Sequence, residues 1–154
     1  MSVIIVITTI SVVFCLIFGL LRLYLATRLR LRKPEGVDTP FVEVLVPVRG
    51  ASVCLDKVVH SLLEQIYPNF KISFVVEDEH DPALPFLQSA CNHQPHGTVL
   101  IAGHAESGAQ KNHNLSFAST FLSPETQIVV TCDANSIAAP YWLDSLTLPI
   151  RIGQ

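Results

Sequence analysis

Hydrophobic residues first gather in one uninterrupted run at the start of the chain. From Val3 to Leu21 the sequence VIIVITTISVVFCLIFGLL contains 19 residues and no charged side chain. A helix rises 1.5 Å per residue, so this run nearly spans a hydrocarbon core of about 30 Å, with Tyr24 at the interface beyond it. A cleaved signal peptide is the alternative, but no basic segment precedes the run, and the run exceeds the usual apolar length. The pattern predicts a transmembrane helix.

Basic residues follow this run directly, whereas no Lys or Arg precedes it. Because positive charge is retained on the cytoplasmic side, we expect the C-terminal body to be cytoplasmic. Residues 28–40 combine charge, Pro and Gly, and are typical of a linker. We therefore expect a signal anchor at 1–27, a basic juxtamembrane linker at 28–40 and a soluble part at 41–154. The basic residues are Arg22, Arg28, Arg30, Arg32 and Lys33.

Beyond Phe41, short apolar runs alternate with segments of helical spacing. The run VEVLVPV at 42–48 is almost continuously apolar, as in a strand that is covered on both faces. Strands that alternate with helices favour an α/β fold with a mostly parallel, helix-flanked sheet. The other expected elements are a helix at 55–66 with Ser52 as N-cap and Pro68 as stop, strands at 71–78, 98–102 and 127–132, and helices at 83–91, 110–121 and from Tyr141 onward.

Polar residues stand where three of these strands end: PVRG at 47–50, EDEHD at 77–81 and CDAN at 132–135. In open parallel sheets ligands bind outside the carboxyl ends of the strands. Asp78 and Asp133 each end an apolar strand, where an unpaired charge is costly. A diphosphate carried by Mg²⁺ or Mn²⁺ is one partner that fits, since these cations prefer oxygen ligands.

Local roles are the alternative for these side chains. A strand-end Asp can cap a helix or form a turn. Asn135 can approach the same ion as Asp133 or serve as a turn residue. The diphosphate hypothesis requires that the carboxylates of Asp78 and Asp133 lie on the same side of the molecule, and that neither is held in a local salt bridge.

The segment GHAESGAQKNHNL at 103–115 joins a predicted strand to a predicted helix. Its Gly103 to Gly108 spacing is that of a Walker loop, but Ala109 and Gln110 replace the Lys and Ser/Thr that such a loop needs. What remains is Lys111 with two asparagines at a helix start. This arrangement can present a cation and amide donors to a nucleotide or sugar phosphate, or it can be an ordinary solvated helix start.

Composition adds bounds to this picture. The 154 residues carry a formal net charge of -3 and are 49% hydrophobic, which leaves material for one modest domain beyond the apolar run. Four cysteines form no CxxC pair, and we interpret them as small core residues. The segment CNHQPH at 91–96 could supply zinc ligands with His104 or His113, but no second close-spaced pair completes a tetrahedral site. The cysteines are Cys15, Cys54, Cys91 and Cys132.

Taken in order, four segments resemble an inverting family 2 glycosyltransferase, and more narrowly its ceramide glucosyltransferase-like branch, which includes hopanoid-associated enzymes. The resemblance implies part of a GT-A fold, a Rossmann-like domain for a nucleotide sugar, expected to be UDP-linked, on the cytoplasmic face of a membrane. Full-length relatives would transfer a hexose to a lipid acceptor. The segments are 44-VLVPVRG-50, 62-LLEQIYPNFKISFVVEDEHDPA-83, 108-GAQKNHNL-115 and 129-VVTCDANS-136.

The resemblance also implies roles for residues at the first two strand ends. Pro47 and Arg49 match the loop near the nucleotide base. Glu77 and Asp78 match the first acidic element, which contacts base and ribose.

Four further residues match the later motifs of the family. Lys111 and Asn114 match the lysine and asparagine that follow the third strand. Asp133 matches the acidic position that binds metal and diphosphate in a motif commonly written DxD, which reads DAN here. Asn135 replaces the second acid. The implied metal ligands are therefore Asp133 and Asn135, and the implied cofactor is Mg²⁺ or Mn²⁺.

The resemblance does not extend to the catalytic base. Enzymes of this family carry a third acidic position and a (Q/R)xxRW acceptor motif well downstream, whereas this sequence stops at Gln154 and has no Arg-Trp pair. An inverting transfer needs a base to deprotonate the acceptor hydroxyl. We assign no catalytic residue, and we interpret the chain as a truncated, donor-binding part of the enzyme.

Two other functions remain open. One is a non-catalytic, membrane-anchored interaction module, in which the acids at the strand ends are caps. The other is a nucleotidyltransferase-like domain, which shares the sheet and the metal-phosphate chemistry. No nucleic-acid partner is expected.

Overall fold

The computed structural model describes residues 13–22, 24 and 39–152. The chain divides into two units, residues 1–37 and 38–154. In the first unit, residues 13–22 and 24 are helical and exposed. No helix within the described ranges is long and apolar enough to cross a membrane. Residues 3–12 of the predicted span and 28–38 of the predicted linker lie outside the described residues.

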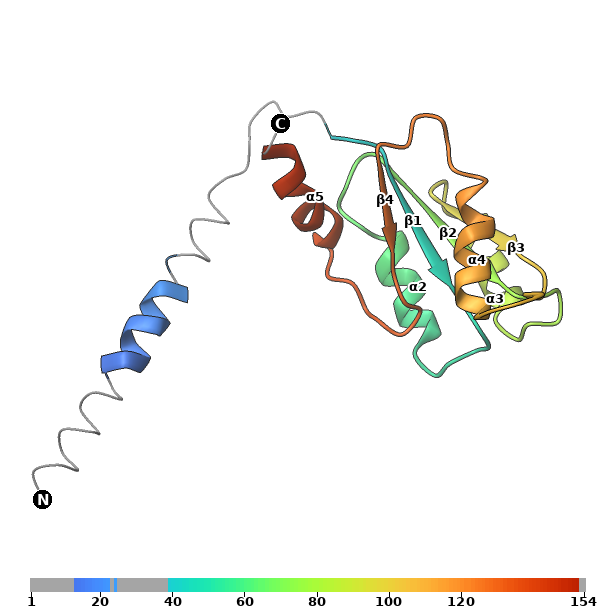
Figure 1. The fold of residues 1–154 in the computed structure, drawn as a ribbon, viewed down its shortest axis with the longest axis horizontal. Coiled ribbons are helices and arrows are strands. Elements are labelled where there is room, and N and C mark those ends of the chain that lie inside the picture. Colours follow the sequence, from blue (N-terminus) through green and yellow to red (C-terminus); the bar gives the residue numbers. More distant parts are fainter. Residues whose placement is uncertain (1–12, 23, 25–38, 153–154) are drawn as a thin grey trace, which may run out of the picture. The chain divides into compact units, whose positions relative to one another are not determined.

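The second unit is built on a sheet of four parallel strands in the order β3-β2-β1-β4 (Figure 1). In register, Val42 of β1 pairs with Phe70 of β2 and with Ile128 of β4, while Ile72 of β2 pairs with Gly97 of β3. Parallel pairing places all four carboxyl ends at one edge of the sheet. The strands are β1 (Val42–Pro47), β2 (Phe70–Val76), β3 (Gly97–Ile101) and β4 (Ile128–Thr131).

Helices cover both faces of this sheet, as the strand pattern predicts. Side chains of successive strand residues point to opposite faces. Val44 and Val46 of β1 pack in one buried cluster with side chains from α2, α3 and α5, whereas Leu45 packs in a second cluster with α4. The expected α/β architecture is therefore confirmed. The helices are α2 (Leu55–Leu63), α3 (Leu84–Asn92), α4 (Gln110–Ser119) and α5 (Trp142–Ile152).

The ends of α2 differ from the prediction. Cys54 occupies the N-cap without a side-chain hydrogen bond, so Ser52 is not the cap. The backbone carbonyl of Ser52 instead accepts a hydrogen bond from the N–H of Leu55 at 3.1 Å. The helix ends at Leu63, well before Pro68, because the N–H of Ile66 donates to the carbonyl of Pro140 at 2.7 Å rather than into the helix.

A carboxylate is buried within β1. Glu43 is only 1% exposed and points to the face that α4 covers. Its Oε1 accepts hydrogen bonds from the backbone N–H of Ser123 at 2.6 Å and from Thr126 Oγ1 at 2.7 Å, and its Oε2 lies 3.9 Å from Lys71 Nζ. Glu43 thus holds the segment that connects α4 to β4 against β1.

Replacing this carboxylate tests its structural role. In Glu43→Ala the N–H of Ser123 and the hydroxyl of Thr126 lose their acceptor beneath the helix layer, so we expect a loss of about 2–3 kcal/mol in unfolding free energy. Urea denaturation followed through the single tryptophan, Trp142, measures this loss. The exposed Glu64→Ala is the matched control and should change stability by less than about 0.5 kcal/mol. Equal effects of the two substitutions would contradict the assignment.

Candidate functional site

A cavity of about 530 Å³ opens at the carboxyl edge of the sheet. It lies beyond the end of β1, which is the switch point of the strand order. From β1 the chain continues to β2 on one side, whereas β4 pairs with β1 on the other side. Such switch points are where open α/β sheets bind ligands. Three strand ends and the start of α4 line it through Pro47, Val48, Arg49, Gly50, Ser52, Leu55, Glu77, Ala109, Gln110, Lys111, Asn114, Asp133, Ala134 and Asn135.

The loop that follows β1 is held by one buried carboxylate. Gly50 has a positive φ of 67°, a conformation that glycine adopts without strain, and its N–H donates to both carboxylate oxygens of Asp81 at 3.0 Å. Asp81 Oδ1 also accepts the N–H of Ala83 at 2.8 Å. Asp81 therefore fixes the wall segment that contains Pro47 and Arg49, a role that the sequence analysis did not assign to it.

Asp133 and Lys111 meet across the cavity. The ammonium Nζ of Lys111 lies 2.5 Å from Asp133 Oδ1, and the two side chains are 54% and 55% exposed. The requirement that Asp133 be free of a local salt bridge is therefore not met. Lys111 stands in the first turn of α4, which packs against β1 and β2, and reaches Asp133 from there. An ion pair this exposed is worth only about 0–1 kcal/mol, so either group can exchange its partner for a ligand at small cost.

Asn114 lines the cavity but uses its amide within the protein. It is 3% exposed; its Nδ2 donates to the carbonyl of Val75 at 3.2 Å, and its Oδ1 accepts from Gln110 Nε2 at 2.7 Å. Gln110 Nε2 also donates to the carbonyl of Gly103 at 2.7 Å. These bonds join the end of β2 to the first turn of α4 and set where Lys111 stands.

Asp78 is the predicted site residue that does not line the cavity. Its Oδ1 accepts the backbone N–H of His80 at 2.6 Å, and its Oδ2 lies 3.6 Å from His104 Nε2. Glu77, directly before it, does line the cavity together with Asp133. The two acidic strand ends thus share one edge of the sheet, but the Asp78 carboxylate is turned toward β3.

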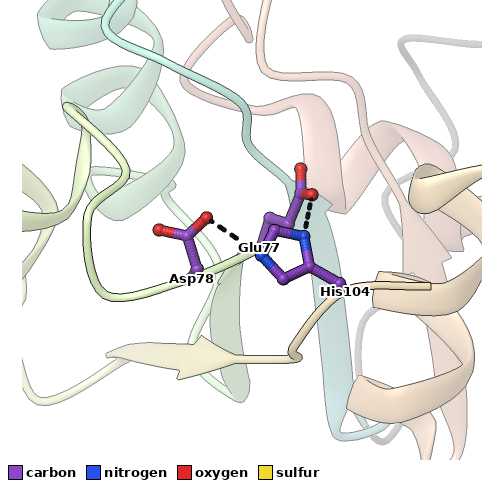
Figure 2. A group of neighbouring side chains, drawn as sticks. All are labelled: Glu77, Asp78 and His104. Atoms are coloured by element: carbon purple, nitrogen blue, oxygen red, sulfur yellow. Dashed lines mark hydrogen bonds and ion pairs between the residues drawn. The ribbon is translucent and has the colours of Figure 1, made fainter. Parts of the chain in front are cut away.

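From the sequence, His104 was expected only as a possible zinc ligand together with the segment 91–96. Figure 2 shows it between Glu77 and Asp78. Its Nδ1 lies 2.5 Å from Glu77 Oε1. Within the described part of the chain, these are the only three His, Cys, Asp or Glu residues grouped closely enough to hold a metal ion. Parallel pairing of β2 and β3 was the available signal, because it brings the residues after both strands together.

The cysteine and histidine residues at 91–96 face other structural partners. Cys91 packs against the main core cluster, and burial raises the pKa of its thiol to about 11. His96 Nδ1 lies 3.1 Å from the carbonyl of Phe70, and His113 Nε2 lies 3.0 Å from that of Ala102. Burial, and then the charge of Asp133, also raise the pKa of Cys132.

Comparison with known proteins gives a consistent result. A family model described as glycosyl transferase family 21 matches residues 6–152. The fold is similar to the mannosyltransferase PcManGT from Pyrobaculum calidifontis, solved with GDP-Man and Mn²⁺, with a TM-score of 0.57, 24% identity and coverage of 87% of this chain and 40% of that one. It is also similar to S. aureus TarS 1-349, with a TM-score of 0.56, 17% identity and coverage of 71% and 32%.

The chain therefore spans well under half the length of these solved structures. Because both identities are below 25%, the likeness shows a shared fold and nothing further. A search among curated proteins finds no matching sequence.

Thiol reactivity tests the placement of the cysteines. Cys54 is exposed, whereas the Cys91 thiol has a pKa raised to about 11. At pH 8 Cys91 is almost entirely the unreactive thiol, so iodoacetamide should alkylate Cys54 at least about tenfold faster, and the difference should shrink as the pH approaches 11. Mass spectrometry of peptides from timed digests measures both rates in the same sample. Equal rates at pH 8 would show that Cys91 is not packed as described.

Proposed function

Because the chain belongs to glycosyl transferase family 21, we propose that it binds a nucleotide sugar in the cavity at the strand ends, as the donor part of a hexosyltransferase. The observation that carries the proposal is the meeting of Lys111, Asp133 and Asn135 in one cavity at the switch point of the sheet. This combination supplies both signs of charge that a metal-bound diphosphate needs.

The diphosphate would lie at the start of α4. The first N–H groups of a helix have no intrahelical acceptor, and the helix dipole favours an anion there. Lys111 stands in this first turn with its ammonium half exposed. Lys111 would therefore leave Asp133 for the diphosphate, to which a lysine is a good point-charge partner.

The base and ribose would lie toward β1 and β2. Arg49 comes from the loop that Asp81 fixes, and Glu77 lines the same cavity. Only Glu77 Oε1 is engaged, by His104; Oε2 has no hydrogen bond or ion pair with the described residues, so it is available to a ribose hydroxyl. Asp78 is not part of this set, since its carboxylate is turned to His104.

The residues at the end of β4 fit a divalent cation. A carboxylate from Asp133 and an amide oxygen from Asn135 are oxygen ligands of the kind that Mg²⁺ and Mn²⁺ prefer. Two protein oxygens do not complete a coordination shell, so diphosphate oxygens and water would supply the rest. When bound, the ion would offset the negative charge of the diphosphate.

The finer parts of the proposal follow from the resemblance in the sequence. We expect a UDP-linked hexose as donor and a lipid as acceptor, with residues 3–21 as a membrane anchor and the cavity on the cytoplasmic side. The structurally similar mannosyltransferase was solved with GDP-Man and Mn²⁺, which supports a nucleotide sugar with a divalent metal as the class of ligand.

Calorimetric titration of the full chain with UDP and with GDP, each with and without Mn²⁺, tests the site. In the wild type we expect Mn²⁺ to strengthen nucleotide binding. In Asp133→Asn the increase in nucleotide affinity that Mn²⁺ causes should be at least about tenfold smaller, which is 1.4 kcal/mol. Lys111→Ala should weaken nucleotide binding both with and without Mn²⁺. The exposed Asp56→Asn on α2 is the matched control.

Other results would favour the other functions. Absence of heat with either nucleotide would contradict donor binding and favour an interaction module. Tighter binding of a nucleoside triphosphate than of a UDP-sugar would favour a nucleotidyltransferase-like domain.

Flotation of the full chain with phospholipid vesicles tests the anchor. We expect the wild type to float with the vesicles and the double variant Leu16→Lys, Ile17→Lys to stay in the dense fraction. A charge costs up to about 2.5–3.5 kcal/mol on insertion scales, with the full cost at the centre of a span. Asp56→Lys alters charge on the exposed face of α2 and should float like the wild type. Equal flotation of the double variant would exclude residues 3–21 as an inserted span.

A further inference from the structure

We propose that Glu77, Asp78 and His104 form a binding site for a transition-metal dication, distinct from the oxygen ligands Asp133 and Asn135. The three side chains can each offer a ligand atom, and these atoms all lie within 4.8 Å of one another. An imidazole with carboxylates suits Zn²⁺, Co²⁺ or Ni²⁺ better than Mg²⁺ or Ca²⁺. The ligand class therefore differs from that expected at the end of β4.

The backbone brings these residues together from two neighbouring strands. The N–H of Ala102 donates to the carbonyl of Val76 at 2.9 Å, so β2 and β3 stay paired up to their last residues. Gly103 then adopts a φ of 80°. This left-handed turn places His104 beside Glu77 and Asp78 (Figure 2).

Both ring nitrogens of His104 face a carboxylate. Nδ1 lies 2.5 Å from Glu77 Oε1, so it carries a proton and donates it to that oxygen. In the neutral imidazole this leaves a lone pair on Nε2. That lone pair faces Asp78 Oδ2 at 3.6 Å, where two acceptors would repel each other. A positive charge between Nε2 and Oδ2 turns this contact into an attraction.

The distance favours a metal ion in that position. At 3.6 Å the Nε2 and Oδ2 atoms are too far apart for a direct hydrogen bond. Two ligand atoms that each bond one Zn²⁺ at about 2.0–2.1 Å lie roughly 3–4 Å apart. Asp78 is also preoriented, since its other oxygen accepts the N–H of His80 at 2.6 Å.

Glu77 would act through His104. A metal-bound histidine usually donates its second ring N–H to a carboxylate, which fixes the tautomer and makes the ligand more basic. The Glu77–His104 contact has this arrangement. His104 is 73% exposed and Asp78 36%, so water can fill the remaining coordination positions.

Metal alone is the probe that tests the site. Co²⁺ and Zn²⁺ are titrated into the full chain, free of any histidine tag and without nucleotide. We expect one equivalent to bind, and His104→Ala and Asp78→Asn each to weaken binding at least about tenfold. Glu77→Gln should weaken binding less than these two, since Gln keeps an acceptor for Nδ1–H. The matched control is His93→Ala, another exposed histidine, which should bind like the wild type. Asp133→Asn reports whether the metal binds at the end of β4 instead.

A second measurement on the wild type does not depend on variants that fold. Long-range ¹⁵N–¹H NMR of the histidine rings should show His104 protonated on Nδ1 alone in the presence of Zn²⁺, with the Nε2 resonance shifted to the metal-bound range. Equal binding by His104→Ala, loss of binding in Asp133→Asn, or a His104 ring that keeps both protons at saturating Zn²⁺ would overturn the proposal. Because nucleotide is left out, none of these outcomes depends on donor binding.

Discussion

Parallel pairing of four strands is the constraint on which the rest of this structure depends. Only a parallel sheet brings every carboxyl end to the same edge, and the order β3-β2-β1-β4 gives that edge a point where the connections diverge. Residues far apart in the chain, such as Arg49 and Asp133, then line one cavity. The buried carboxylate of Glu43 supports this arrangement from the opposite end of β1, because it ties the segment that leads into β4 to the central strand.

Two kinds of charged group occupy that edge. At the end of β4, Lys111 and Asp133 are paired yet half exposed, so each can turn to a ligand at small cost. At the ends of β2 and β3, both ring nitrogens of His104 face carboxylates. Glu77 belongs to both groups, since it lines the cavity with one side and supports His104 with the other.

Much of this architecture could be predicted because it depends on local patterns. The almost continuously apolar run at 42–48 predicted a strand that is covered on both faces, and the resemblance to a glycosyltransferase with a GT-A fold is confirmed. The ceramide glucosyltransferase-like branch is consistent with the matching family 21. What depends on three-dimensional contacts could not be predicted in this way. Ser52 has the chemistry of a cap but lies outside the helix, and Asp78 follows a buried strand like Asp133 but turns to His104. Only the register between β2 and β3 reveals that contact.

The two hydrogen bonds from Gly50 to Asp81 have a further consequence for the wall of the cavity. Asp81 also accepts a hydrogen bond from the N–H of Ala83, the residue that precedes α3. It therefore holds the loop that contains Arg49 to the start of this helix. The conformational entropy of this loop is lost when the protein folds, not when a ligand arrives. A ligand would therefore contact a fixed loop on the β1 side of the cavity and the adjustable Lys111–Asp133 ion pair on the α4 side. Adjustment to different ligands is then expected at the ion pair and not at the loop.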